Sequence, residues 1–321
     1  MAKILRIYLM FTLLCASVSY AGLIDGAYCV APAKPEGGFD VTCKLLNEAL
    51  LKSREIKKPL SIHYQPGGVG ALAFNTTVRQ HANDKSRLVA FSSGTLLNLA
   101  QNRFGENGVD DVKWLAVVGI DYGVVVVQKD APYKNLNALI EAIKANPEQI
   151  AFGSSGTIGS QDWIKATLIS RKADVNHKRV KVVAFEGGGD ALNALQGGHI
   201  QVLAGDTGEV TKLLTSGKVR VLAVMSDARL PGVWASVPTA REQGYDLMWS
   251  SLRGVYVGPG VSAKDTIDLE DAIKRSVTKK SYDDSLSTFG FQYKLITGEE
   301  LQLLVRKTVD DYKKILREYK L

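Results

Sequence analysis

The sequence predicts an α/β protein of two lobes, each a mostly parallel sheet flanked by helices. Short apolar segments of strand length alternate along the chain with segments whose apolar residues recur at helical spacing, which is typical of such sheets. The 321 residues suit two domains of ordinary size. A charged amphipathic helix at the C-terminal end is expected to return to the first sheet, so the chain crosses between the lobes twice. Two crossings make a hinge, and a hinged cleft can close on a ligand.

The first residues predict a signal peptide over 1–21. Lys3 and Arg6 precede an apolar run over 7–18, and the small residues of Ser19-Tyr20-Ala21 suit cleavage before Gly22. The run is too short for a membrane span, and no other stretch reaches that length. We therefore expect a mature protein that is soluble and exported. A lipid anchor is disfavoured, because large residues precede both candidate cysteines, Cys15 and Cys29.

The first lobe is expected to comprise residues 22–124 and 248–321. A strand ends near Val30, and a helix follows to about Lys52. Apolar alternation predicts further strands over 60–64, 88–91, 114–119 and 123–127, with helices over 71–81 and 96–102. Residues 256–258 precede a Pro259-Gly260 turn, and the tail adds a helix over 264–278, a strand over 291–295 and a long helix over 299–319. The apolar stripe of that last helix is Leu301, Leu304, Val305, Val309, Tyr312 and Leu316.

The second lobe is expected to comprise residues 125–247 and to follow the same plan. Helices are predicted over 135–145, 160–172, 190–196 and 209–215. Strands are predicted over 150–152, 180–185, 200–204 and 219–225, and a short helix begins at Pro238. No residue-level repeat relates the two halves.

One glycine-rich loop ahead of the first helix indicates an anion site. Pro32 and Pro35 stop regular structure, Gly37 and Gly38 free the backbone, and Asp40 stands where an N-cap is expected. A helix N-terminus carries unpartnered N–H groups and a partial positive charge, which suit a carboxylate or phosphate. Read alone, such a loop is also an ordinary connection. Similar loops recur at 92–95, 154–161 and 186–189, and helix N-termini gathered at the carboxyl ends of strands form a crevice for an anion.

Two cysteines flank this loop. Once Cys15 is removed with the signal peptide, Cys29 and Cys43 remain. A disulfide between them would close a loop of about fifteen residues and contribute roughly 3 kcal/mol in the chain-entropy model. Two free buried cysteines are the alternative, which an oxidising compartment disfavours.

Charge and side-chain chemistry exclude several functions. The formal net charge of +7 falls to +5 without Lys3 and Arg6, and the basic residues are interleaved with acids, so a nucleic-acid partner is not expected. A mild positive field would instead steer small acids. The four histidines lie on unrelated elements without metal-ligand spacing, so we predict no metal. No nucleophile elbow or Walker loop is present, and we expect neither a cofactor nor an enzyme.

Several motifs together resemble one family. They are APAKPEGGFDVTCKLL from Ala31, PGGVGALAFN from Pro66, VAFSSGTLLNLAQ from Val89, VDDVKWLAVVG from Val109, GSSGTIGSQDW from Gly153, VAFEGGGDALNAL from Val183 and VPTAREQGYD from Val237. This set is similar to the substrate-binding proteins of tripartite tricarboxylate transporters, also called Bug receptors, and most of all to the citrate-binding TctC type. The segment Gln161-Asp162-Trp163 and the cysteine pair also resemble the TctC type rather than the family at large.

The resemblance implies a periplasmic Venus-flytrap binding protein of type II that is a monomer. It would deliver citrate or a related tricarboxylate to the permease subunits of the transporter in the membrane. A receptor for a dicarboxylate or an aromatic carboxylate, and the sensing partner of a two-component kinase, remain alternatives. In the family two loops hold a carboxylate through main-chain amides, hydroxyls and water. Carried over by position, these residues are Gly37, Gly38, Phe39, Asp40, Ser154, Ser155, Thr157, Gly159, Ser160 and Gln161.

Four further residues are candidates for the site. Ser92 and Ser93, in the second of the four loops, are added as candidate ligand residues. Asp206 ends a strand and either faces the cleft or caps the next helix together with Thr207. Arg253 suits a clamp for a distal carboxylate, but a surface salt bridge is the favoured interpretation.

Overall fold

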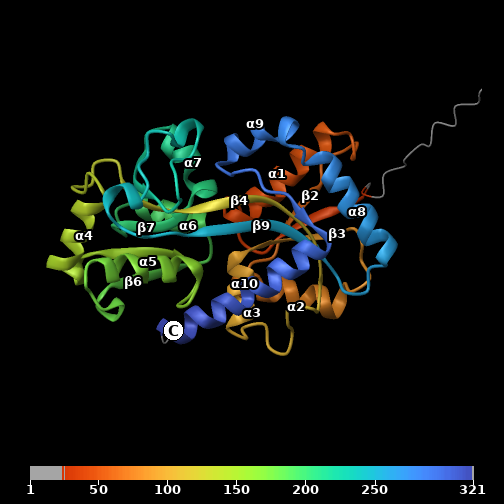
Figure 1. The fold of residues 1–321 in the computed structure, drawn as a ribbon, viewed down its shortest axis with the longest axis horizontal. Coiled ribbons are helices and arrows are strands. Elements are labelled where there is room, and N and C mark those ends of the chain that lie inside the picture. The colour runs from red at the N-terminus through yellow and green to blue at the C-terminus, as the bar shows by residue number, and fades with distance from the viewer. Residues whose placement is uncertain (1–23, 25, 320–321) are drawn as a thin grey trace, which may run out of the picture.

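The computed structural model describes residue 24 and residues 26–319, so the expected signal peptide lies outside the described residues. The strands form one sheet that passes through both lobes, with helices on its two faces (Figure 1). Within the described part of the chain no helix is both long and apolar enough to cross a membrane.

The first half of the molecule contains the N-terminal and C-terminal elements. Its strands are β1 (Tyr28–Ala31), β2 (Ser61–Tyr64), β3 (Arg87–Ser92) and β10 (Ile296–Thr297). Its helices are α1 (Gly38–Lys52), α2 (Ala71–Gln80), α3 (Ser93–Ala100), α8 (Ala263–Ser276), α9 (Lys279–Phe289) and α10 (Gly298–Tyr319). β1 pairs in parallel with β2 and β3. Helix α9 is missing from the sequence-based expectation, and the strand expected over 291–295 is only a bridge between Ile120 and Gln292 followed by β10.

The second half contains four helices and four strands of its own among the described residues. The helices are α4 (Leu136–Ala145), α5 (Gln161–Lys172), α6 (Gly188–Gln196) and α7 (Thr207–Thr215). The strands are β5 (Ala151–Ser155), β6 (Lys181–Phe185), β7 (Val202–Asp206) and β8 (Val219–Val224). β5 pairs in parallel with β6 and β7. The short helix expected from Pro238 is a single 3₁₀ turn at Arg241–Gln243.

Two long strands connect the halves. β4 (Lys113–Gln128) and β9 (Ser250–Val257) run antiparallel side by side through the middle of the molecule (Figure 1). The expectation of two strands, 114–119 and 123–127, was wrong, because the segment between them stays extended and paired with β9. From Gly123 onward β4 pairs with β7 and β8 instead. This change of partners supports the two-lobe division at 124/125 and 247/248, which stays a proposal.

The core explains why the C-terminal helix returns. Leu301, Val305 and Val309 of α10 are buried in one cluster with Phe91 and Trp114. The rings of Phe91 and Trp114 meet edge to face at 4.7 Å. Helix α10 thereby packs on α3 and β4, as the apolar stripe of its sequence predicts.

Candidate functional site

A cavity of about 220 Å³ lies where loops from the two halves meet. From the first half it is lined by the loops before α1 and α2 and by the end of β3. From the second half it is lined by the loops after β5 and β6 and by α7. Its lining includes Gly37, Gly38, Phe39, Ser92, Ser155, Thr157, Gln161, Gly187, Gly188, Glu209 and Arg253.

Two helix N-termini face each other across this cavity. Helix α1 begins after Gly37 and helix α6 begins after Gly187, and neither has a side-chain hydrogen bond that caps it. A Cβ on Gly37 would lie 3.7 Å from the backbone N of Gly188, so the two ends approach closely. Their aligned dipoles favour a negative group between them, and at α1 the N–H of Gly38 already donates to Oε1 of Glu209 at 3.1 Å.

The covalent structure of the chain holds the first loop in place. Cys29 of β1 is bonded to Cys43 of α1, as expected. Asp40 lies in the first turn of α1 rather than at its N-cap, and its Oδ2 accepts hydrogen bonds from the N of Glu36 at 2.7 Å and from Nζ of Lys44 at 2.6 Å. The hydroxyl of Tyr64 donates to Oδ1 at 2.9 Å. Asp40 therefore braces the loop from behind, away from the cavity wall.

The serine-rich loop after β5 divides into lining and supporting residues. The hydroxyl groups of Ser154 and Ser160 are 2.9 Å apart and buried behind the wall. Ser155 lines the cavity, and its buried hydroxyl has no hydrogen-bond partner among the described residues. Thr157 lines it as well, while its Oγ1 accepts a hydrogen bond from Arg103 at 3.1 Å. The free hydroxyl of Ser155 is thus available to a ligand.

The two serines of the α3 loop differ in the same way. Ser92 lines the cavity and caps α3, since its Oγ accepts a hydrogen bond from the N of Gly94 at 3.1 Å. Ser93 is buried, and its Oγ accepts from the N of Leu252 at 2.9 Å, which ties α3 to β9. Among the sequence-predicted residues, those that line the cavity are Gly37, Gly38, Phe39, Ser92, Ser155, Thr157 and Gln161, and those that lie behind or beside it are Asp40, Ser93, Ser154, Gly159, Ser160 and Asp206.

A buried ionic cluster adjoins the cavity, and sequence reasoning missed most of it. Arg253 of β9 is 2% exposed, so the interpretation as a surface salt bridge was wrong. Its Nη2 donates to Asp121 at 2.6 Å and to Asp206 at 2.8 Å. Its Nε is buried without a partner among the described residues, and the side chain lines the cavity. Arg253 therefore lines the cavity and has one N–H group, at Nε, without a hydrogen-bond partner among the described residues.

Lys165 of α5 balances the other side of the cluster. Its Nζ is fully buried and lies 2.6 Å from Asp206 and 2.9 Å from Asp162. Burial lowers the pKa of Lys165, but the two carboxylates outweigh burial and raise it, so the ammonium stays charged. Asp206 occupies the N-cap position of α7 without a capping hydrogen bond, which rules out the shared-cap interpretation. Gln161 also donates to Asp206, at 2.9 Å.

The sequence carries one signal for this cluster. Lys165 interrupts the apolar face that α5 presents to the core, and Arg253 interrupts the apolar strand β9. A single charge within an apolar pattern indicates either a buried ion pair or a site. Which carboxylates pair with these two cations depends on distant segments and is not readable from the sequence.

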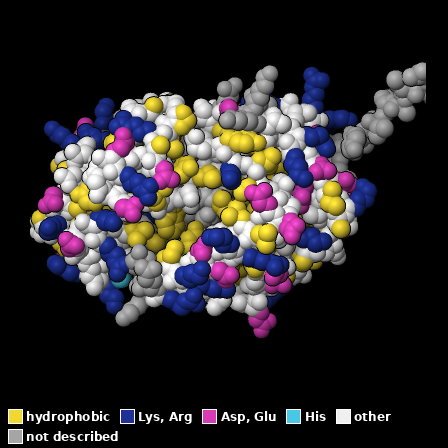
Figure 2. Space-filling model, in the orientation of Figure 1, with side chains coloured by type: hydrophobic (Ala, Val, Ile, Leu, Met, Phe, Trp, Pro, Cys, Tyr) yellow, Lys and Arg dark blue, Asp and Glu magenta, His cyan; other side chains and the backbone are white. Residues whose placement is uncertain are grey.

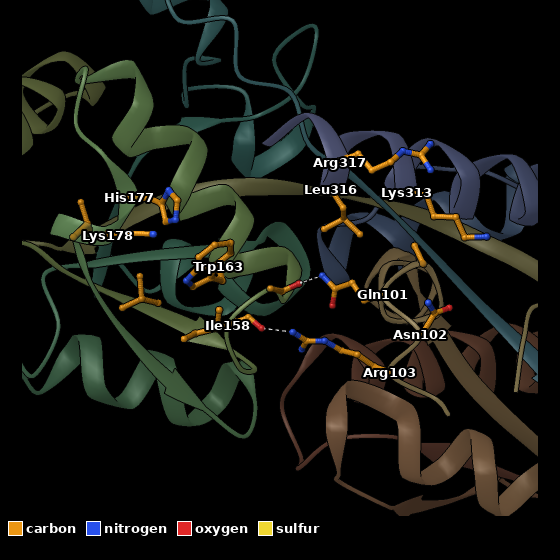
Figure 3. Close-up of a pocket in the computed structure, with 14 residues that line it drawn as sticks. Gln101, Asn102, Arg103, Ile158, Trp163, His177, Lys178, Lys313, Leu316 and Arg317 are labelled. Carbon is orange, nitrogen blue, oxygen red and sulfur yellow. Dashed lines mark hydrogen bonds between the residues drawn. The ribbon is translucent and has the colours of Figure 1, made fainter. Parts of the chain in front are cut away.

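A larger and shallower groove lies beside the cavity. It holds about 1150 Å³ between the end of α3, the loop before α5 and the last turns of α10 (Figure 3). Figure 3 shows Gln101 and Arg103 reaching across to the backbone oxygens of Gly159 and Ile158. These bonds tie the serine-rich loop to the other half. Among the described residues, the groove has neither two facing helix N-termini nor a buried N–H or O–H donor without a partner. The smaller cavity is therefore the better candidate site.

Surface charge agrees with the sequence analysis. On the face in Figure 2 the lysine and arginine side chains are spread over the molecule and interleaved with aspartate and glutamate. No group of three or more metal-binding side chains is found among the described residues.

Comparisons with known proteins give a consistent result. The model of the tripartite tricarboxylate transporter family receptors matches residues 47–321. A UPF0065 protein from the gbd 5′ region of Cupriavidus necator is 24% identical over 88% of this chain and 84% of its own length. Protein BugT of Bordetella pertussis is 23% identical over 90% of this chain and 87% of its own length.

Solved structures share the fold. The periplasmic binding protein BugD superposes with a TM-score of 0.81 at 19% identity, over 92% of this chain and 98% of that one. Rpa4515 of R. palustris with adipate gives a TM-score of 0.83 at 19% identity, over 92% and 97%. MatC of Rhodopseudomonas palustris with bound malate gives 0.77 at 21% identity, over 91% and 99%.

Proposed function

Because this chain belongs to the receptor family of tripartite tricarboxylate transporters, we propose that it captures citrate or a related tricarboxylate and delivers it to the permease of such a transporter. The family consists of periplasmic solute-binding receptors rather than enzymes, and its members bind small organic acids and work with transporter permeases. We place the protein in the periplasm, after cleavage of the N-terminal signal peptide.

One observation carries the proposal: the N-termini of α1 and α6, which have no hydrogen bond from an N-cap side chain, converge on a cavity that Arg253 and Ser155 also line, and Nε of Arg253 and Oγ of Ser155 have no hydrogen-bond partner among the described residues. All four groups are hydrogen-bond donors, and a ligand with several carboxylate oxygens would satisfy them together. Each hydrogen bond to a carboxylate contributes about 1.5–3 kcal/mol. Three or four of them would support micromolar affinity.

Size favours a small acid. A cavity of about 220 Å³ is below the roughly 300–1,000 Å³ typical of pockets for drug-sized ligands. A dicarboxylate is the second candidate, since the similarly folded MatC and Rpa4515 are described with malate and with adipate. The cavity alone does not rank these acids.

Titration calorimetry with citrate, isocitrate, tricarballylate, malate, succinate and adipate tests the proposal. We expect the tightest binding for a tricarboxylate; tighter binding of malate or adipate would favour the dicarboxylate alternative, and no heat with any of them would refute the function. The variant Ser155→Ala is expected to bind about fivefold more weakly, from the loss of roughly 1 kcal/mol of hydrogen bonding. Its unfolding free energy should not fall, because the hydroxyl has no hydrogen-bond partner among the described residues. The exposed Ser61→Ala serves as a control with unchanged affinity.

A further inference from the structure

Glu209 is a carboxyl group in the cavity wall that the proposed function does not use. Its Oε1 accepts a hydrogen bond from the backbone N of Gly38 at 3.1 Å, which links α7 to the N-terminus of α1. A Cβ on Gly188 would lie 2.4 Å from Cδ of Glu209, so the carboxyl group also packs against the N-terminus of α6. Its second oxygen, Oε2, accepts no hydrogen bond from the described residues. The side chain thus sits between the two helix N-termini with one oxygen still free.

The surroundings of Glu209 already hold an excess of negative charge. Asp121, Asp162 and Asp206 lie in the adjoining cluster, whose cations are Arg253 and Lys165. With Glu209 ionised, four carboxylates would face two cations. The other charged groups that line this cavity or the adjoining one beside α7 are Glu186, Glu36, Lys212 and Asp40 with its partner Lys44, and Asp190 at the start of α6 pairs with Lys34.

An acid with two or three charges would add to this excess. Like charges within a few ångströms of each other do not remain ionised together in a buried site, and one of them takes up a proton instead. Arg253 cannot neutralise the ligand alone, because its Nη2 is already shared between two aspartates. The proton therefore needs a site that touches the ligand, and the free oxygen of Glu209 provides one.

We propose that Glu209 is a specificity-determining residue that binds the ligand as a neutral carboxylic acid, donating a hydrogen bond from Oε2 to a carboxylate of the ligand while Oε1 still accepts from Gly38. The proton comes from solvent and stays on Glu209. This inference rests on the proposed function and adds proton uptake to it. At any pH at which Glu209 is ionised in the free protein, one proton is taken up with each acid that binds.

Two effects oppose each other at Glu209: the helix N-termini favour its carboxylate, whereas burial and the neighbouring aspartates favour its neutral acid. Burial, followed by repulsion from Asp162 and Asp206, raises the pKa of Glu209 to about 8, against the opposing effect of Arg253 and Lys165. Carboxylic acids held neutral at pH 7 in this way are effective hydrogen-bond donors to anions. Below pH 8 the proton is already present, and above pH 8 Glu209 takes up a proton from solvent when the ligand binds.

Calorimetry from pH 7 to 9.5 in two buffers of different ionisation enthalpy tests the inference, with citrate as the probe, or malate if the panel favours it. Both acids are fully ionised above pH 8, so protons counted there belong to the protein. For the wild type we expect the affinity to fall tenfold per pH unit above pH 8, about 30-fold by pH 9.5, with proton uptake approaching one per acid. Glu209→Gln, which is neutral at every pH and keeps a donor, should bind with constant affinity above pH 8 and take up no proton.

Glu186→Gln is the matched control, because Glu186 lines the same cavity but is exposed. It should keep the wild-type fall in affinity above pH 8 and the wild-type proton uptake. Wild-type affinity that stays constant above pH 8, or a pH dependence that persists in Glu209→Gln, would overturn the role of Glu209 and leave the receptor function intact. No binding of any acid at pH 7 would overturn the proposed function, and this inference with it. The wild-type proton count decides the matter even if Glu209→Gln fails to fold.

Discussion

Replacing Gly38 by alanine is expected to destabilise the protein, although helix propensity predicts the opposite. Gly38 is the first residue of α1 and has no positive φ. An alanine at such a position normally stabilises a fold by about 0.4–1 kcal/mol, because it lowers the conformational entropy of the unfolded chain. A Cβ at this position, however, would lie 2.2 Å from Nη1 and 2.6 Å from Cζ of Arg253. Cβ contacts under 3.0 Å essentially do not occur in real structures.

The guanidinium cannot withdraw at low cost. It is buried, and its Nη2 is held by Asp121 at 2.6 Å and by Asp206 at 2.8 Å. Breaking a buried pair by removing one partner costs about 3–5 kcal/mol, and a displaced guanidinium loses a large part of that. After the propensity gain is subtracted, we expect Gly38→Ala to lower the unfolding free energy by about 2–3 kcal/mol.

Urea unfolding of Gly38→Ala beside Gly37→Ala measures this effect. The nearest atoms to a Cβ on Gly37 are 3.7 Å away, an ordinary contact, so Gly37→Ala should remain within about 1 kcal/mol of the wild type. Calorimetry of both variants measures their affinity for citrate. Gly38→Ala should bind citrate at least tenfold more weakly, because Arg253 is displaced. Equal stability and equal affinity of the two variants would refute the contact between Arg253 and the start of α1.

Three further outcomes are expected. Lys165→Met should lower the unfolding free energy by about 3–5 kcal/mol, because it leaves its carboxylate partners buried without a counter-charge; a loss under 1 kcal/mol in urea unfolding would contradict this. Replacing Cys29 and Cys43 together by alanine should cost about 3 kcal/mol, measured against the wild type with and without a reductant. The stability of the wild type relative to Glu209→Gln should decline from pH 4.5 to pH 8 and then level off, because the folded protein keeps the Glu209 proton to about pH 8 and the unfolded chain releases it near 4.5; parallel pH profiles would show that the carboxyl is not perturbed.

The fold could be predicted from the sequence where the signal is local. The apolar stripe of α10 and the alternation of strands with helices both depend on residues within one element, and the structure agrees with them. The long strand β4 was divided in the prediction because Asp121 interrupts its apolar pattern. In the structure that aspartate is buried and paired with Arg253, 132 residues away, and no local pattern contains this partner.

The candidate site follows the same rule. The loops that carry Gly37, Gly38 and Ser155 were predicted because glycine, proline and serine punctuate the chain ahead of helices. Glu209 looked like one of many charges at the start of a helix. Its position depends on how α7 meets α1 and α6, three elements that are distant in sequence and adjacent only in the fold.

The placement of the charges suggests how selectivity and lobe closure are connected. Arg253 and Asp121 lie on the paired strands β4 and β9, and Asp206 pairs with Gly123 of β4, so this part of the cluster stays together when the lobes bend about these strands. The hydrogen bond from Gly38 to Glu209 joins α1 of the first half to α7 of the second at the cavity. The ion pairs among Arg253, Asp121 and Asp206 therefore lie on the strands that connect the halves, whereas the anion site between α1, α6 and Glu209 needs elements of both halves. A ligand that contacts α1, α6 and Glu209 together therefore bridges the two halves, and an acid that cannot accept a hydrogen bond from Glu209 loses one of these contacts.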